Sequence, residues 1–322
     1  MKDYLPIFLA GFLPVYLLTA LLAKSFRKHA VMMSAGVPMS GGTAMALTLL
    51  AALAVWRFPL GAGLFVGAAL ITVMGILDDV RELSVRAKFL FQAAAAAALI
   101  AGGIRTHIYF LGDWLNLLVS FLWIVGITNS FNLLDISDGL AGGIALSVCA
   151  GFLTISLVNG DAVSSALICV FSGCIVGFLP HNLPPARAYM GNTGSHLIGF
   201  FLSAVALNVS YAPAPEYSLA LASPLVILGF PIADTVFVIL LRITNGRSAV
   251  AKSKDHLALR MLCAGYSKTR MLASMVLASL FFALCGVAIC FLPPAFGLAF
   301  ICSALGLTVF LSLRMSRVSI HG

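Results

Sequence analysis

The sequence predicts an all-α fold, a polytopic integral membrane bundle of about eleven transmembrane helices. Hydrophobic residues make up 61% of the 322 residues and charged residues only 9%, and the mean hydropathy is +1.08. Globular proteins contain about 25% charged residues, so this chain cannot cover a water-exposed surface. A single buried core cannot absorb the excess, because cores stop growing near about 250–300 residues. Lipid must therefore surround most of the chain, which excludes disordered, disulfide-scaffold and nucleic-acid-binding classes.

Each span is expected where about 20 mostly apolar residues follow one another. Such stretches recur from one end of the chain to the other, separated by short joints of Gly, Pro or charged residues. We expect spans at residues 4–23, 41–56, 60–77, 89–104, 114–131, 139–158, 162–180, 194–211, 219–241, 271–292 and 296–313. The second and fourth are short for a span. No joint is long enough for a further domain, so residues 1–322 are expected to form one membrane domain.

Basic residues fall unevenly on the two sides of this path. Alternating the spans places all but three of the 19 Lys and Arg residues on one side, the exceptions being Lys2, Arg57 and Arg105. Because cytoplasmic loops are rich in Lys and Arg, we expect the N-terminus outside and the C-terminus in the cytoplasm. The net charge of +8 then reflects a basic cytoplasmic rim. The expected cytoplasmic loops cover residues 24–40, 78–88, 129–138, 181–193 and 242–270.

Two adjacent carboxylates, Asp78 and Asp79, end the third apolar stretch. Neighbouring anions repel and raise each other's pKa, and a divalent cation or the nearby Lys88 would relieve that repulsion. A solvated helix end followed by a polar loop is the alternative. The pair alone does not decide between these interpretations.

A more specific pattern is the recurrence of Asn129, Asn132, Asp135 and Asp138 at every third residue. This spacing places amides and acids along one side of a helix or of a helix-to-loop transition. Amide and carboxylate oxygens suit Mg²⁺, which binds through few protein ligands together with waters and substrate phosphates. The alternative is a turn rich in Asn and Asp that caps the next span.

Two further polar stretches lie on the same expected side. Residues 178–195 are rich in Pro and Gly, and the end of this stretch opens a span, where free backbone N–H groups can hold a phosphate. A simple helix cap by Asn192 or Ser195 is the alternative. The longest loop, 242–270, can bind a diphosphate through its basic side chains. An ordinary cytoplasmic loop, which is also rich in basic residues, explains its lysines equally well. These side chains include Lys252, Lys254, His256 and Arg260.

Taken in order, these motifs resemble those of the polyprenyl-phosphate N-acetylhexosamine-1-phosphate transferases, over most of the chain from Pro38 to Gly265. The matching elements are Gly-x-x-Asp-Asp at Asp78 and Asp79 with Lys88 and Gln92, Asn-x-x-Asn-x-x-Asp-x-x-Asp-Gly at Asn129–Gly139, Asn-x-x-Pro-Ala at Asn182–Ala186, and Pro231-x-x-Asp234 with Arg242. Several ordered motifs are more specific than any one of them.

The resemblance implies that a UDP-HexNAc donates its sugar-1-phosphate to a polyprenyl phosphate and that UMP is released. It implies a multi-pass enzyme of the bacterial inner membrane, with its active site on the cytoplasmic face, that serves cell-envelope glycan assembly. The expected partners are the UDP-sugar, the polyprenyl phosphate and the membrane, without nucleic acid, and a homodimer stays open. The expected cofactor is Mg²⁺, with Mn²⁺ as an alternative.

The resemblance also implies roles for individual residues. Catalytic roles are expected for Asp78, Asp79 and Lys88, substrate binding for Asn129, Asp135, Asp138, Asn182, His256 and Arg260, and metal binding for Asn132, Asn192 and Asp79. Two positions depart from the family pattern: Asn192 stands where an Asp is usual, and Leu259 where a second His is usual. A relative that binds lipid phosphate or nucleotide without turnover is therefore one alternative. A secondary transporter is a weaker one, because most of the acids lie at one membrane face.

Overall fold

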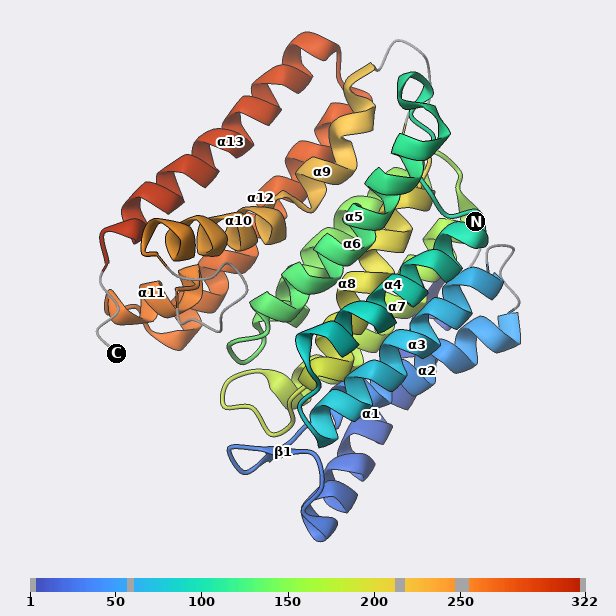
Figure 1. The fold of residues 1–322 in the computed structure, drawn as a ribbon, viewed down its shortest axis with the longest axis vertical. Coiled ribbons are helices and arrows are strands. Elements are labelled where there is room, and N and C mark those ends of the chain that lie inside the picture. Colours follow the sequence, from blue (N-terminus) through green and yellow to red (C-terminus); the bar gives the residue numbers. More distant parts are fainter. Residues whose placement is uncertain (1–3, 57–60, 212–217, 247–254, 319–322) are drawn as a thin grey trace.

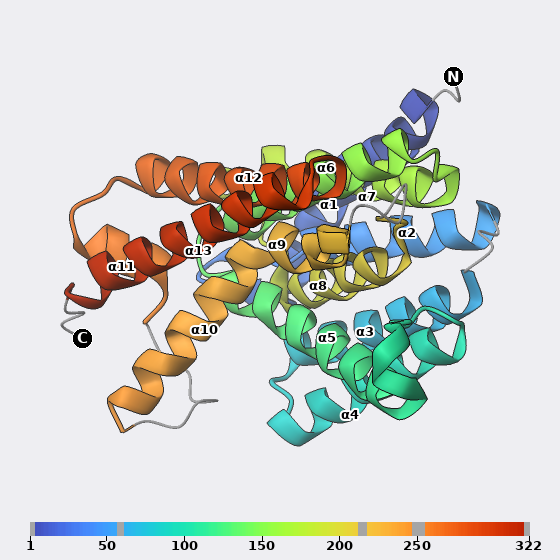
Figure 2. The same ribbon diagram turned by 90° about the horizontal axis from the view of Figure 1, so that it is seen from above.

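The computed structural model describes residues 4–56, 61–211, 218–246 and 255–318. Most of its helices lie side by side along a common direction, while α10 crosses that direction obliquely (Figures 1 and 2). The helices are α1 (Tyr4–His29), α2 (Gly41–Trp56), α3 (Gly61–Val80), α4 (Val85–Ala101), α5 (Gly112–Leu134), α6 (Leu140–Val158), α7 (Ala162–Asn182), α8 (Gly191–Asn208), α9 (Ser223–Ile227), α10 (Gly229–Thr244), α11 (Leu257–Cys263), α12 (Lys268–Phe291) and α13 (Pro294–Ser316), with short 3₁₀ turns η1 (Tyr109–Leu111) and η2 (Ser218–Ala222).

Seven helices of the described residues are long and apolar enough to cross a membrane, and a bent pair, residues 219–227 with α10, would make an eighth. The chain is thus a polytopic helical membrane protein. The remaining expected spans, 41–56, 89–104 and 194–211, correspond to α2, α4 and α8, which are shorter or begin with polar residues. The count of eleven spans and their orientation stay predictions.

The expected span 219–241 is not one straight helix, because residues 219–227 and α10 meet at a bend of 64°. The bend follows from Pro231, which has no N–H to donate to the carbonyl of Ile227 and therefore breaks the helical ladder at Leu228. Gly229 lets the bend pack closely against α12, since an added Cβ would collide with the ring of Phe282. As a result α10, which carries Arg242 in its last turn, leaves the common helix direction (Figure 2).

A short antiparallel hairpin, β1 (Met33–Ser34) with β2 (Val37–Pro38), is an exception to the all-α prediction. It joins α1 to α2 and lies beside the loop between α7 and α8 (Figure 1). Ala30, Met32 and Ala35 adopt positive φ angles around it, a region that non-glycine residues rarely occupy. The segment that leaves α1 is therefore a defined structure rather than an open loop.

The helices approach one another closely through small residues, as is usual where lipid replaces water. An added Cβ on Gly11 would meet the Val170 carbonyl, and one on Gly173 would meet the Phe8 carbonyl, so that α1 and α7 are in backbone contact. α8 lies at the centre, with every residue from Thr193 to Ala206 buried. The same close approach at glycine residues, at the polar end of α8, sets the geometry of the site.

Candidate active site

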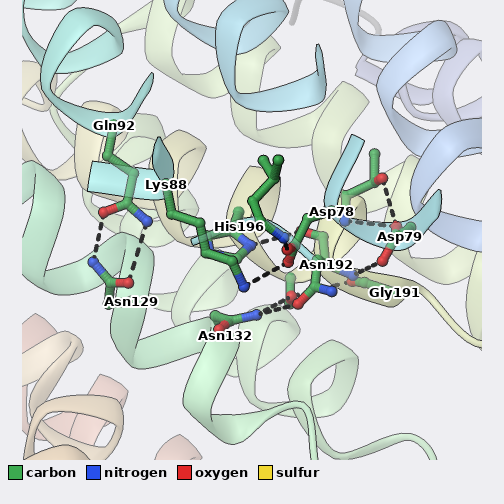
Figure 3. Close-up of polar contacts among 12 residues, drawn as sticks. Asp78, Asp79, Lys88, Gln92, Asn129, Asn132, Gly191, Asn192 and His196 are labelled. Atoms are coloured by element: carbon green, nitrogen blue, oxygen red, sulfur yellow. Dashed lines mark hydrogen bonds and ion pairs between the residues drawn. The ribbon is translucent and has the colours of Figure 1, made fainter. Parts of the chain in front are cut away.

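The polar end of the bundle is where α2, α3 and α8 touch. A Cβ on Gly75 would collide with the backbone of Thr193, and a Cβ on Gly42 would collide with the backbone at Met190 and Gly194. Because α3 can approach this closely, Asp79 in its last turn reaches the first turn of α8 (Figure 3). Asp78 and Asp79 therefore belong to a helix rather than to the expected loop 78–88.

Asp79 caps α8 from a neighbouring helix. Its Oδ1 accepts a hydrogen bond from the Asn192 N–H at 2.7 Å, and its Oδ2 accepts one from the Thr193 N–H at 3.0 Å and one from Thr193 Oγ1 at 2.7 Å. The first turn of a helix has free N–H groups and positive polarity, so a carboxylate there is favourable. Asp79 thus acts on the site through the position of α8, and its expected metal-binding role stays a prediction.

Asp78 makes different contacts from Asp79. Its Oδ1 accepts the Leu83 N–H at 2.7 Å, and its Oδ2 pairs with Lys88 Nζ at 2.7 Å, with the Asp78 side chain 1% exposed and the Lys88 side chain 24% exposed. The pair bridges the turn between α3 and α4. Lys88 neutralises one of the two adjacent carboxylates, as the sequence suggested, and keeps part of its side chain accessible.

The amides of α5 point at two different partners. Asn132 donates through Nδ2 to Asn192 Oδ1 at 3.1 Å and to Ser195 Oγ at 3.0 Å. Asn129 forms a reciprocal amide pair with Gln92 of α4, at 2.8 and 3.2 Å (Figure 3). Asn132 and Asn192 are therefore side by side, as a shared ligand site requires, whereas Asn129 faces α4.

A cavity of about 580 Å³ opens beside these groups. Six of the expected site residues line it. Five of them come from α5, the turn after α5, α8 and the segment before α11. These five are Asn132, Asp135, Asp138, Asn192 and His256; Asn182 of α7 also lines the cavity, as do Ser34 and Ala35 of the hairpin, Tyr189 and Arg242. The structure thus gathers residues separated by more than a hundred positions at one polar end of an apolar bundle.

Asp135 differs from the other carboxylates, because its side chain accepts no hydrogen bond from any residue that the structure describes. Burial raises the pKa of Asp135 from the ordinary value of 3.8 to about 7, with smaller contributions from the carboxylates of Asp79 and Asp138. An anion held close to two others is stabilised by a bound cation. Asp135 is the cavity carboxylate best placed to serve one.

Asp138 and Asn182 hold the loops around the cavity. Asp138 Oδ2 accepts the Ala186 N–H at 3.2 Å. The Asn182 amide accepts the Gly139 N–H at 2.9 Å and donates to the Ala188 carbonyl at 3.0 Å. Gly139 adopts a positive φ of 74°, which favours glycine. Both side chains line the cavity while their polar atoms are largely occupied by the loop backbone.

His256 closes the cavity from the side of α10. Its Nδ1 lies 3.4 Å from Oδ2 of the fully buried Asp234, whose Oδ1 accepts the Leu257 N–H at 3.2 Å. Arg260 does not line the cavity, because its guanidinium donates to backbone carbonyls at the end of α13. Its expected substrate-binding role stays a prediction. Lys252 and Lys254 lie outside the described residues.

Two residues of this region were absent from the expected site. Arg242 lines the cavity and is 3% exposed; a charge at the end of an apolar stretch was the signal, because ionisable groups at membrane depth are costly. His196, buried in α8, donates through Nδ1 to the Asn192 carbonyl at 2.8 Å and lies next to Lys88 and Asp78 (Figure 3). Only its position one turn after Asn192 marked it.

The donors at the cavity fit a weakly held Mg²⁺ ion. The described residues contain no group of three or more His, Cys, Asp or Glu that could hold a metal ion, which excludes an all-protein cage from this part of the chain. Mg²⁺ instead favours one or two carboxylates, waters and substrate phosphates. The amides of Asn132 and Asn192 with the Asp135 carboxylate match that requirement.

Comparison with known proteins identifies the family. A family model described as glycosyl transferase family 4 matches residues 61–210. The chain is 30% identical over 275 residues to the decaprenyl-phosphate N-acetylglucosaminephosphotransferase of Mycobacterium leprae, an alignment that covers 73% of this chain and 68% of that relative. The chain belongs to glycosyl transferase family 4. The family inferred from the ordered motifs is thereby confirmed.

Two other relatives of this family 4 member point the same way. It is 36% identical over 210 residues to the "Probable undecaprenyl-phosphate N-acetylglucosaminyl 1-phosphate transferase" of Bacillus subtilis, with 63% of this chain and 58% of the relative covered. It is 31% identical over 220 residues to the undecaprenyl-phosphate alpha-N-acetylglucosaminyl 1-phosphate transferase of Thermotoga maritima, with 68% and 66% covered. The family 4 member thus spans between 58% and 68% of the length of these three relatives.

Proposed function

We propose that this family 4 member transfers a HexNAc-1-phosphate from a UDP-sugar to a polyprenyl phosphate and releases UMP. The observation that carries the proposal is the 580 Å³ cavity, where amides, carboxylates and basic side chains meet at one end of an apolar bundle. The names of the three relatives support a polyprenyl phosphate as acceptor and N-acetylglucosamine as the sugar.

In the proposed reaction an oxygen of the acceptor phosphate attacks the sugar-linked phosphorus of the donor. The bond from that phosphorus to the bridging oxygen breaks, and the oxygen leaves with UMP. Several negative charges meet in this step, so that positioning and charge stabilisation supply most of the catalysis. A Mg²⁺ or Mn²⁺ ion, when bound, neutralises phosphate charge. Asn132, Asn192 and Asp135 would hold it.

The remaining side chains of the site bind different parts of the two substrates. Lys88, held by Asp78, has a partly exposed side chain whose ammonium is suited to the acceptor phosphate. Arg242 and His256 are basic residues of the cavity lining and form its basic wall for the donor diphosphate, and Asp138, which also lines the cavity, serves the nucleoside. A lipid acceptor reaches such a site from the bilayer, because the cavity lies at the end of spanning helices.

We further propose eleven spans in the bacterial inner membrane, with the N-terminus outside and the cavity facing the cytoplasm. Support comes from the basic residues that gather at the cavity end: α1 ends there with Arg27, Lys28 and His29, and Arg27 donates to the Arg187 carbonyl at 2.9 Å. Cytoplasmic ends of membrane helices carry such an excess of positive charge.

The test is UMP release by the purified protein with polyprenyl phosphate, labelled UDP-HexNAc donors and Mg²⁺. We expect turnover with the wild type, and a loss of about 100- to 1,000-fold in kcat for Asp135→Asn, the size typical of removing one charge-stabilising group. Asp161→Asn, in the α6–α7 turn, is the matched control and should keep full activity. Unchanged turnover in Asp135→Asn would refute the role given to Asp135.

A binding protein without turnover is the second candidate, and one observation favours it. Asn192 brings no negative charge, and its amide oxygen accepts a hydrogen bond from Asn132. The same assay separates the two functions with the variant Asn192→Asp. Absence of UMP release from the wild type across the donor panel, together with its appearance in Asn192→Asp, would establish the non-catalytic function.

A further inference from the structure

Arg260 is a buried cation that the proposed chemistry does not use. It lies in α11, is 5% exposed, and its guanidinium lies 5.8 Å from the centroid of the Phe237 ring of α10. A buried guanidinium is strongly unfavourable unless its N–H groups are satisfied. The hydrogen-bond partners of Arg260 therefore indicate which segments of the protein it positions.

On one side Arg260 holds the residue next to His256. Its Nη2 donates to Asp255 Oδ1 at 2.9 Å, and its Nε donates to the Asp255 carbonyl at 3.3 Å. Side chain and backbone of Asp255 are thus fixed by one planar group, which is the geometry that distinguishes Arg from Lys. His256 follows immediately and lines the cavity.

Asp255 also faces the cavity's other basic residue. Its carboxylate attracts the Arg242 guanidinium electrostatically, and Arg242 lines the cavity as His256 does. Arg260 therefore fixes a carboxylate that precedes His256 in the chain and attracts Arg242. A shift of Asp255 would move His256 through the backbone and Arg242 through charge.

On the other side Arg260 holds the end of α13. Its Nη1 donates to the carbonyls of Met315 at 3.1 Å and Val318 at 2.6 Å, with Ser316 at 3.5 Å. The last carbonyls of a helix are otherwise unpaired and carry negative polarity, so a cation is favourable there. Figures 1 and 2 both show α11 beside the C-terminal end of α13.

We propose that Arg260 is a positioning residue that ties the C-terminal end of α13 to Asp255 and so sets the basic wall formed by His256 and Arg242. The inference rests on the proposed function only in taking that wall as the site of the donor diphosphate. It makes the end of α13 part of the donor site, although none of its described residues lines the cavity.

The experiment compares Arg260→Ala, Arg260→Lys and a chain truncated after Arg314, each purified in detergent. Arg270→Ala, an exposed arginine at the start of α12, is the matched control. Hydrogen–deuterium exchange of residues 255–263 and binding of UDP are measured first, because neither depends on turnover. The kinetic constants for the UDP-sugar and for the polyprenyl phosphate follow.

Arg260→Ala should increase exchange in residues 255–263, weaken UDP binding, and lower kcat/KM for the UDP-sugar about 10- to 100-fold, the cost of an ångström-scale misplacement. The KM for the polyprenyl phosphate should not change. Arg260→Lys should recover part of the loss, since the lysine keeps a positive charge beside Asp255. It cannot donate to the three carbonyls as effectively as the guanidinium does. The truncation should reproduce Arg260→Ala, and combining the two should add little.

Unchanged exchange and unchanged UDP binding in Arg260→Ala would overturn the proposal. So would equal losses toward both substrates accompanied by a lower melting temperature, since that pattern marks general destabilisation. If the wild type released no UMP, the proposed function would fail, while the exchange and UDP-binding results would still decide the role of Arg260.

Discussion

At the scale of single residues, identical side chains have separate tasks that follow from their contacts. Asp79 accepts three hydrogen bonds from the first turn of α8, whereas Asp135 accepts none from the described residues and faces the cavity. The first carboxylate is satisfied by the fold, and the second is left for a ligand. This difference also predicts how stability depends on pH.

The raised pKa of Asp135, about 7 against an ordinary 3.8, means that the folded protein holds this proton more tightly than the unfolded chain. Its stabilising contribution is therefore complete below about pH 4 and is lost as the pH rises toward 7. Without divalent cation, Asp135→Asn should melt higher than the wild type at pH 8, by about 2–4 °C for each kcal/mol relieved. At pH 4 the two should melt alike.

Differential scanning fluorimetry in detergent across this pH range measures the difference. Mg²⁺ should raise the melting temperature of the wild type at pH 8 and have little effect on Asp135→Asn. A constant difference between the two proteins from pH 4 to pH 8 would be inconsistent with the raised pKa.

At the scale of elements, the site depends on how closely two helices approach. α3 and α8 touch at Gly75 and Thr193, and this contact brings the end of α3 within reach of the first turn of α8. Helix packing in lipid relies on such small residues. The glycine therefore acts on the site although it bears no functional group.

Gly75→Ala should push α3 away from α8 and weaken the hydrogen bonds of Asp79, since the new methyl group meets backbone rather than a movable side chain. We expect a destabilisation of about 1–3 kcal/mol and loss of most UMP release. Gly61→Ala, in the first turn of the same helix, meets nothing within 4 Å and serves as the control. Melting curves and turnover of both variants decide the question, and equal behaviour would refute the close-contact argument.

At the scale of the whole molecule, the bundle has one polar end that collects the cavity, the hairpin and the basic end of α1. The proposed orientation places that end in the cytoplasm. Two native cysteines are exposed, Cys263 at the end of α11 and Cys302 within α13, and the other five are buried. This pattern provides a test that needs no added label site.

A membrane-impermeant maleimide should label Cys263 in inverted membrane vesicles and leave it unlabelled in intact cells. Cys302 should stay unlabelled in both, because lipid surrounds the middle of a spanning helix and excludes the polar reagent. Cys263→Ser should abolish the signal in inverted vesicles. Labelling of Cys263 from outside intact cells would reverse the proposed orientation.

The sequence by itself determined that this is a helical membrane protein, and its ordered motifs determined the family, because hydropathy and local spacing are properties of the chain alone. It also indicated which polar residues would meet, and Asn132, Asp135, Asp138, Asn192 and His256 do share one cavity. Only the tertiary structure decided that Asp79 caps α8, that Arg260 serves α13, and that α9 and α10 diverge. The first two outcomes depend on contacts between elements distant in sequence, such as Gly75 with Thr193, which no local pattern encodes. The bend between α9 and α10 has a local cause in Pro231, but its angle of 64° is a property of the folded chain.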